Sequence, residues 1–133
     1  MRQNQVALAQ GLFNVVSGGW ALVHRRSFEA VLGTKTDWWL VQTVAGLLVG
    51  NGMMQLTAGR EGRGLGSARQ VGMATAATLL AIELRYGIPG HIRRTYLLDV
   101  PVEVAWIVLW LESREGDRRS GVLGTLPGCG KVR

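Results

Sequence analysis

The sequence predicts an all-α fold in which four transmembrane helices form an antiparallel bundle. Four apolar segments lie along the 133-residue chain. Each is about 17–21 residues long, and about 20 helical residues are needed to cross ~30 Å of hydrocarbon. The connections between them are short enough to make neighbouring helices antiparallel. The formal net charge of +6 is typical of the basic loops that flank membrane helices, so we expect the lipid bilayer as a partner and no nucleic acid.

The four segments cover about residues 5–23, 38–58, 68–88 and 95–112. The first leads directly into a basic loop without a small-residue cleavage site, so we expect no cleavable signal peptide. A soluble four-helix bundle is the competing interpretation. It is disfavoured because the first, second and fourth segments lack the wide polar face that a surface helix needs. Residues 1–112 are therefore expected to form one transmembrane domain.

The connections carry turn and capping signals. Ser27–Leu32 is expected to form an interfacial helical turn with Ser27 as its N-cap. The Gly-rich residues 59–67 are typical of a flexible linker. Pro89 and Gly90 form a turn pair that should end the third helix sharply. The polar tail, residues 113–133, shows no sustained period and is expected to be disordered.

The distribution of Lys and Arg predicts the orientation of the bundle. The N-terminus, the second connection and the tail carry nine of these residues, whereas the first and third connections with their flanks carry six. Cytoplasmic loops are enriched in Lys and Arg, so both termini are expected in the cytoplasm. The predicted location is the bacterial inner (plasma) membrane, as a multi-pass integral protein.

Three acidic residues lie deeper than the ends of the apolar segments. Asp99 and Glu103 are one helical turn apart, and Trp106 and Trp110 continue the same stripe. This stripe cannot face lipid, since an ionised carboxylate at membrane depth costs ~3 kcal/mol. Glu83 lies about one turn inside the end of its helix, and antiparallel threading brings it to the same outer end.

Two interpretations of these acids remain open. They either form register-locking ion pairs with nearby arginines or line an acidic pocket that binds a cation, a proton or a polar ligand. The ligand-binding candidates are Glu83, Asp99, Glu103, Arg25, Arg26 and Arg85.

Other chemistries lack a sequence signal. His24 and His91 lie in separate loops without the i, i+4 spacing of a metal-binding helix, so no metal site is expected. No Ser or Cys nucleophile has an adjacent base in the sequence, and catalytic residues cannot be assigned. Gly128–Lys131, which includes the only cysteine, Cys129, lacks the first half of a phosphate-binding loop. No cofactor is predicted.

Gly46 and Gly50 form a GxxxG pattern in the second segment. Small residues at this spacing let helix backbones approach closely in a membrane. We expect packing within the chain first, and a homo- or hetero-oligomer second.

The run RSFEAVLGTKTDWWLVQTV and the YLLD stretch followed by Glu103 resemble small four-helix bacterial integral membrane proteins that have no assigned activity. The similarity covers roughly residues 11–112. The resemblance implies an integral membrane location and supplies no catalytic residues.

The leading functional hypothesis is a non-enzymatic accessory or small-ligand-binding protein with an acidic pocket near the outer side. One alternative is a membrane enzyme that uses Glu83, Asp99 or Glu103 as a general acid or base on a lipid-like substrate. Another is a subunit of a proton- or cation-coupled transporter, which four helices without an inverted repeat favour less.

Overall fold

The computed structural model is all-α, as predicted. It describes the backbone of residues 1–123 and the side chains of residues 1–113. In chain order the helices are α1 (Gln3–Val23), α2 (Arg25–Leu32), α3 (Trp38–Glu61), α4 (Leu65–Gly87), the 3₁₀-helix η1 (Arg94–Leu98) and α5 (Val100–Leu123).

The last predicted helix is divided into η1 and α5. Pro101 lies in the first turn of α5, where its missing N–H costs no intrahelical hydrogen bond. The backbone N–H of Glu103 donates to the Asp99 carbonyl at 2.9 Å, so α5 starts directly after Asp99. The helix also continues to Leu123 instead of ending at Glu112. The disorder predicted from residue 113 is therefore wrong as far as Leu123, because Arg, Glu and Leu favour helix despite their irregular pattern. Residues 124–133 lie outside the described part.

The connections largely follow their signals. Ser27–Leu32 is helical, as part of α2, but the N-cap is His24 and not Ser27. The backbone N–H of Ser27 donates to His24 Nδ1 at 3.3 Å, which caps the helix one turn earlier. Residues 59–67 are not the flexible linker that the sequence predicted: α3 continues to Glu61 and α4 begins at Leu65, and the residues between them form a tight turn with Gly62 and Gly64 at φ 66° and 70°. At Pro89-Gly90 the chain turns after α4, as expected.

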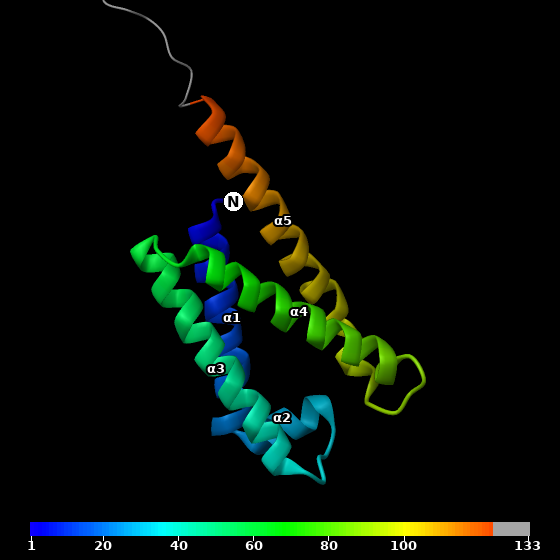
Figure 1. Cartoon of the computed structure of the whole chain (residues 1–133). Coiled ribbons are helices and arrows are strands. Elements are labelled where there is room, and N and C mark those ends of the chain that lie inside the picture. The colour runs from blue at the N-terminus through cyan, green and yellow to red at the C-terminus, as the bar shows by residue number, and fades with distance from the viewer. Residues whose placement is uncertain (124–133) are drawn as a thin grey trace, which may run out of the picture.

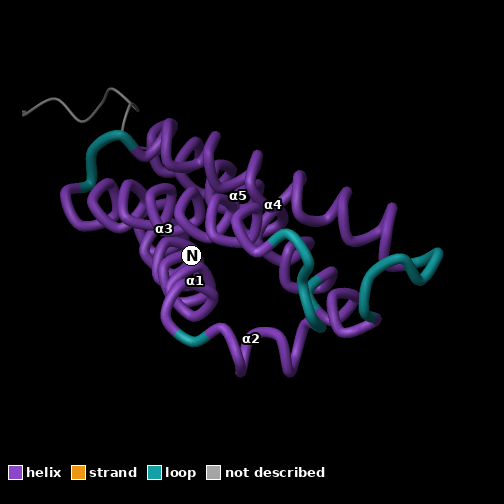
Figure 2. The backbone as a smooth tube through the Cα atoms, turned by 90° about the horizontal axis from the view of Figure 1, so that it is seen from below, coloured by secondary structure: helices purple, strands orange, loops and turns teal. Residues whose placement is uncertain are grey.

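The four long helices form two pairs. Figure 1 shows α1 beside α3 and α4 beside α5, and the pairs diverge toward the end that holds α2. The N-terminus and the α3–α4 turn lie at the opposite end, from which α5 extends further. Figure 2 shows α2 leaving the end of α1 at a steep angle. The arrangement is the antiparallel one that the short connections predict.

Close contact between α1 and α3 depends on glycine. A methyl group added at Gly11 would lie 2.8 Å from the Gly52 carbonyl oxygen, and one added at Gly52 would lie 2.6 Å from the Gly11 carbonyl oxygen. The predicted GxxxG glycines behave differently, since a Cβ at Gly46 or Gly50 would meet nothing within 4 Å. Gly46 and Gly50 therefore do not mediate the packing inside the chain that the sequence predicted. Gly52, which does contact α1, lies on another side of α3.

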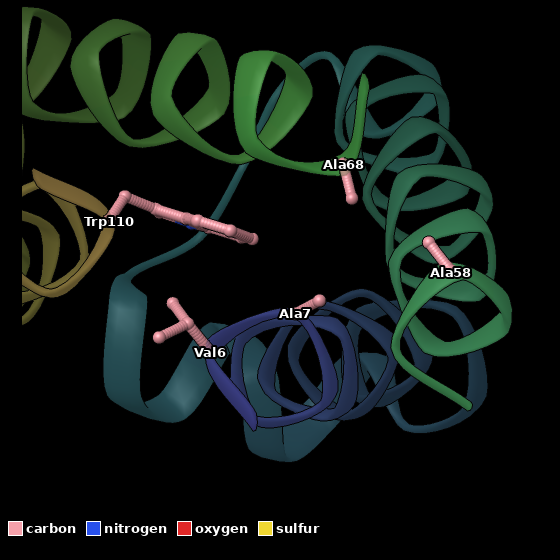
Figure 3. Packing of buried hydrophobic residues seen from close by; sticks show 5 residues of the cluster. All are labelled: Val6, Ala7, Ala58, Ala68 and Trp110. Carbon is pink, nitrogen blue, oxygen red and sulfur yellow. The ribbon is translucent and has the colours of Figure 1, made fainter. Parts of the chain in front are cut away.

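The apolar core lies near the end that holds the N-terminus. Figure 3 shows the ring of Trp110 extending from α5 into the space between α1 and α4. Trp110 is fully buried, and its neighbours in the core are small side chains: Val6, Ala7, Ala58 and Ala68. The small side chains leave room for the one large ring.

A buried amide network links all four long helices. The side-chain oxygen of Gln10 accepts hydrogen bonds from Gln55 Nε2 and Trp110 Nε1, each at 2.7 Å. Gln10 Nε2 donates to the Gly72 carbonyl at 3.1 Å, and Gln55 Oε1 accepts from Asn14 Nδ2 at 2.9 Å. Each buried amide thus has a partner on another helix.

By length and composition, α1 is the one helix among the described residues that could cross a membrane, with a mean hydropathy of 1.5 over its best window. A signal sequence or the core helix of a soluble protein would meet the same requirement. The mean hydropathies of α3, α4 and α5 are too low for a membrane span. In α3 the cause is its Trp, Gly, Asn and Gln residues, and in α4 and α5 it is their charged residues. The four spans that the sequence predicted are thus not shown.

Candidate functional site

A pocket of about 560 Å³ lies at the α2 end of the molecule. All five α-helices and η1 contribute to its lining, and most of the contributed side chains are apolar. On the walls formed by α1, α3 and α4, the apolar side chains are Phe13, Trp20, Ala21, Leu40, Val41, Val44, Ala45, Leu48 and Leu79. The pocket is therefore a largely apolar space enclosed by segments that are distant in the sequence.

The three acidic residues that the sequence singled out, Glu83, Asp99 and Glu103, line this one pocket. Glu83 comes from α4, Asp99 directly precedes α5, and Glu103 lies in its first turn. Glu83 and Glu103 are 4% and 2% exposed, and the Oε2 atom of Glu83 is buried without a hydrogen-bond partner. Among residues 1–113, no side chain forms a hydrogen bond or ion pair with any of the three carboxyl groups. Buried polar groups are rarely left without partners, so this arrangement calls for an explanation.

Asn14 and Ser17 of α1 add polar groups to the lining. Sequence reasoning noted them as interruptions in an apolar helix but did not include them in the site. Their spacing of three residues, which places both on one helix face, was the signal that could have found them. Asn14 also belongs to the amide network, so the network and the pocket are continuous.

The three candidate arginines do not line the pocket, and the predicted ion pairs with its acids are absent from the described residues. Arg25 pairs with Glu29 at 3.2 Å, and its guanidinium lies 4.5 Å from the centre of the Trp38 ring. Arg26 is exposed, and Arg85 is exposed with its guanidinium 5.8 Å from the ring centre of Tyr86. For Arg85 the cause is helical spacing, because residues two apart point to opposite sides of a helix.

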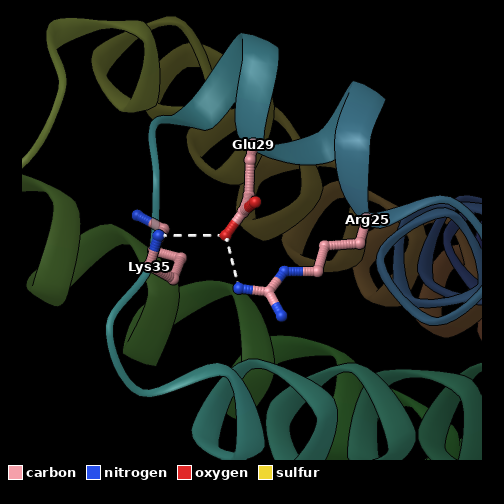
Figure 4. Close-up of polar contacts among 3 residues, drawn as sticks. All are labelled: Arg25, Glu29 and Lys35. Carbon is pink, nitrogen blue, oxygen red and sulfur yellow. Dashed lines mark hydrogen bonds and ion pairs between the residues drawn. The ribbon is translucent and has the colours of Figure 1, made fainter.

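Figure 4 shows how Glu29 holds the loop after α2. One Oε1 atom accepts both from the Arg25 guanidinium at 3.2 Å and from the backbone N–H of Lys35 at 3.1 Å. The hydrogen bond from Arg25, together with that from Lys35, lowers the pKa of Glu29 below its ordinary value. The acidic residue that pairs with Arg25 therefore stabilises the loop after α2 and is not part of the pocket lining.

Helix α2 and η1 form the end wall of the pocket. Arg93 Nη1 donates to the Ala30 carbonyl at 2.8 Å, and Thr95 Oγ1 donates to the Val31 carbonyl at 2.9 Å. On the other side of α2, the Phe28 ring packs edge-on against Trp20, with ring centres 5.4 Å apart. These contacts hold α2 across the space where the two helix pairs diverge.

In the part of the chain that the structure describes, no three His, Cys, Asp or Glu side chains are grouped so that they could hold a metal ion. Comparison with known proteins gives no match to a family model, a curated protein or a solved structure. The function is therefore argued from this geometry alone.

Proposed function

We propose that the chain is a multi-pass protein of the bacterial inner membrane that binds a small ligand in the acid-lined pocket and has no catalytic role. The membrane part of the proposal is supported by an inverted distribution of polarity. Among residues 1–113, six polar side chains are buried, including Gln10, Gln55, Glu83 and Glu103, whereas the buried apolar residues other than Trp110 are Val or Ala.

The outer surface is apolar where a soluble bundle would be polar. Exposed large hydrophobic residues occur on every long helix: examples are Leu12 and Val16 of α1, Leu47 and Met53 of α3, Ile82 and Leu84 of α4, and Val104, Val108 and Leu111 of α5. Large exposed apolar side chains on all four long helices favour contact with a membrane or a partner. Lipid is an appropriate solvent for such a surface, because the buried Gln10, Asn14 and Gln55 have protein partners and Glu83 and Glu103 line a cavity, although the buried Trp106 Nε1 has no hydrogen-bond partner.

This polarity argument also addresses the low mean hydropathy of α3, α4 and α5. An average over a helix counts Gln55, Glu83 and Glu103 against a membrane location, although all three are buried inside the bundle. A multi-pass bundle tolerates polar groups on faces that other helices cover. Only the exposed faces of the helices would contact lipid, so their polarity, and not the average over each helix, is the relevant measure.

The observation that carries the ligand-binding proposal is the unpartnered Glu83 carboxyl group in an apolar pocket of about 560 Å³. Ligand pockets are commonly ~300–1,000 Å³, mostly apolar, and supplied with a few polar groups that orient the ligand. A purely structural acid would be expected to have a partner. The pocket instead offers a carboxyl group to whatever enters it.

The proposal can be tested on protein purified in detergent by native mass spectrometry of retained small molecules. Leu79→Trp should fill the pocket from α4 and remove the retained molecule, whereas Leu111→Trp, at an exposed position of α5, should leave it bound. Equal retention by the two variants, or no retained molecule in the unsubstituted protein, would contradict a binding role. Resistance of the protein to extraction from membranes by alkaline carbonate tests the membrane part separately.

A further inference from the structure

We propose that the ligand of the pocket is a lipophilic organic cation, a molecule with one positive charge and an apolar body. The inference rests on the proposed binding function and names its ligand class. It is derived from three features of the same pocket: the unpartnered acids, the commitment of nearby cations to other groups, and the apolar and aromatic walls.

The first feature is the acids. Glu83 and Glu103 are more than nine-tenths buried, and both line the pocket together with Asp99. Glu83 Oε2 has no hydrogen-bond partner. An ionised carboxylate at membrane depth costs ~3 kcal/mol, and this cost falls when an opposite charge lies beside it. A cationic ligand would supply that charge where the protein supplies none.

The second feature is that nearby basic side chains bind elsewhere. Arg25 pairs with Glu29, and Arg93 donates to the Ala30 carbonyl. Lys35 donates to the Leu32 carbonyl, and its Nζ lies 4.6 Å from the centre of the Tyr96 ring. All three occur at the same end of the molecule, yet each has a partner outside the acid cluster. The acids therefore remain available to a positive charge from outside the chain.

The third feature is the rest of the lining. Leu40, Val44, Leu48 and Leu79 form apolar walls, and Trp20, Phe28 and Tyr96 contribute aromatic rings. A bare inorganic cation does not match these walls. It requires several oxygen ligands and would fill little of a 560 Å³ space. Aromatic rings attract organic cations by cation–π contact, and the apolar body gains by leaving water. We therefore place the charge of the ligand beside Glu83 and Glu103, and its body against these apolar and aromatic walls.

Two probes of the same shape and opposite charge test this inference. Tetraphenylphosphonium and tetraphenylborate both partition into apolar media, so a difference in their binding reports the charge preference of the site. Binding to the full chain in detergent would be measured by equilibrium dialysis. We expect saturable binding of the phosphonium at one site per chain, at least tenfold tighter than any binding of the borate.

The double variant Glu83→Gln/Glu103→Gln keeps the side-chain size and removes both charges. It should weaken phosphonium binding at least tenfold, whereas Glu112→Gln, which removes one carboxyl group at an exposed position of α5, should leave it unchanged. If the double variant does not give monodisperse protein, Asp99→Asn is measured in its place, because Asp99 is only partly buried. Equal binding of the two probes, or unchanged phosphonium binding without the acids, would overturn the inference.

The outcome also separates this inference from the proposed function. If Leu79→Trp removes a retained molecule but the acid variants do not affect phosphonium binding, the pocket binds a ligand and the inference of a cationic ligand is wrong. If Leu79→Trp leaves both the retained molecule and the phosphonium bound, the pocket is not the site, and both proposals fail.

Discussion

At the scale of single residues, the amide group of Gln10 joins more helices than any other described side chain. It contacts α3 through Gln55, α4 through the Gly72 carbonyl and α5 through Trp110. We expect Gln10→Leu to lower the free energy of unfolding by about 1–3 kcal/mol, because buried N–H groups of Gln55 and Trp110 would lose their acceptor. Denaturation in mixed detergent micelles measures this change. Gln70→Leu, at an exposed position of α4, is the matched control and should change stability little.

Glu29 provides a prediction about pH. Its pKa is lowered in the folded protein, first by the hydrogen bond from Arg25 and then by that from the Lys35 backbone. A lowered pKa means that the ionised form favours the folded loop, so this contribution is present above the ordinary pKa and is lost as pH falls through the lowered one. We therefore expect the Lys35 amide to exchange faster with solvent, relative to its intrinsic rate, on acidification below the usual range of a glutamic acid. Hydrogen-exchange NMR measures this change.

The control for this prediction is Glu29→Gln. The glutamine oxygen can still accept from the Lys35 N–H, but it has no charge to lose. The pH dependence of Lys35 protection should therefore disappear in the variant, while Arg63 and Glu61, which form a separate exposed ion pair, are unaffected. Persistence of the same pH dependence in Glu29→Gln would show that another group controls the loop.

At the scale of elements, the glycines of α3 make opposite predictions. Gly52 faces the backbone of α1, whereas Gly50 faces open space. Gly52→Leu should force α1 and α3 apart and destabilise the fold by about 1–3 kcal/mol or more, as overpacking does. Gly50→Leu should retain the fold. Thermal unfolding of the two variants in detergent distinguishes them, and equal destabilisation would contradict the described α1–α3 contact.

Gly50→Leu also tests the oligomer that the sequence predicted through Gly46 and Gly50. The exposed position of both glycines leaves this surface free for a second copy of the chain. Crosslinking in native membranes should detect a dimer in the unsubstituted protein and much less of it in Gly50→Leu. Unchanged crosslinking would contradict an interface at this surface.

Elements with regular apolar patterns could be predicted, and those governed by tertiary contact could not. The start of α3 at Trp38 follows from the change of composition after Asp37, and the end of α4 follows from Pro89. The side of α3 that meets α1 did not follow, because the sequence offers glycines on more than one face. The choice of Gly52 over Gly46 and Gly50 depends on the rotation of the helix against its neighbour. That rotation depends on how α1 and α3 pack together, and the sequence of α3 alone does not reveal it.

At the scale of the whole molecule, the sequence placed the three pocket acids at one end because antiparallel threading requires it. The ion pairs with arginines, which were one of the two interpretations, do not form among the described residues for a physical reason. Arginines at the ends of helices can reach water or nearby aromatic rings, and Arg25 and Arg85 do so. An acidic pocket was one of the two interpretations, but its largely apolar lining was not predicted, since it arises where the α1–α3 and α4–α5 pairs diverge and α2 closes the gap.

The orientation of the proposed membrane bundle gives the last prediction. Figure 1 places the N-terminus and the α3–α4 turn at the end from which α5 continues toward the C-terminus, and α2 and the loop before η1 at the other end. The first end, with the tail, carries nine of the fifteen Lys and Arg residues. We therefore expect a reporter inserted at Gly62, or fused after Arg133, to be cytoplasmic, and one inserted at Gly90 to be extracytoplasmic. Paired alkaline phosphatase and green fluorescent protein reporters read the two sides independently. If all three positions reported the same side, the multi-pass arrangement would be wrong. If every position reported the opposite side, the bundle would remain, and the acid-lined pocket would open toward the cytoplasm.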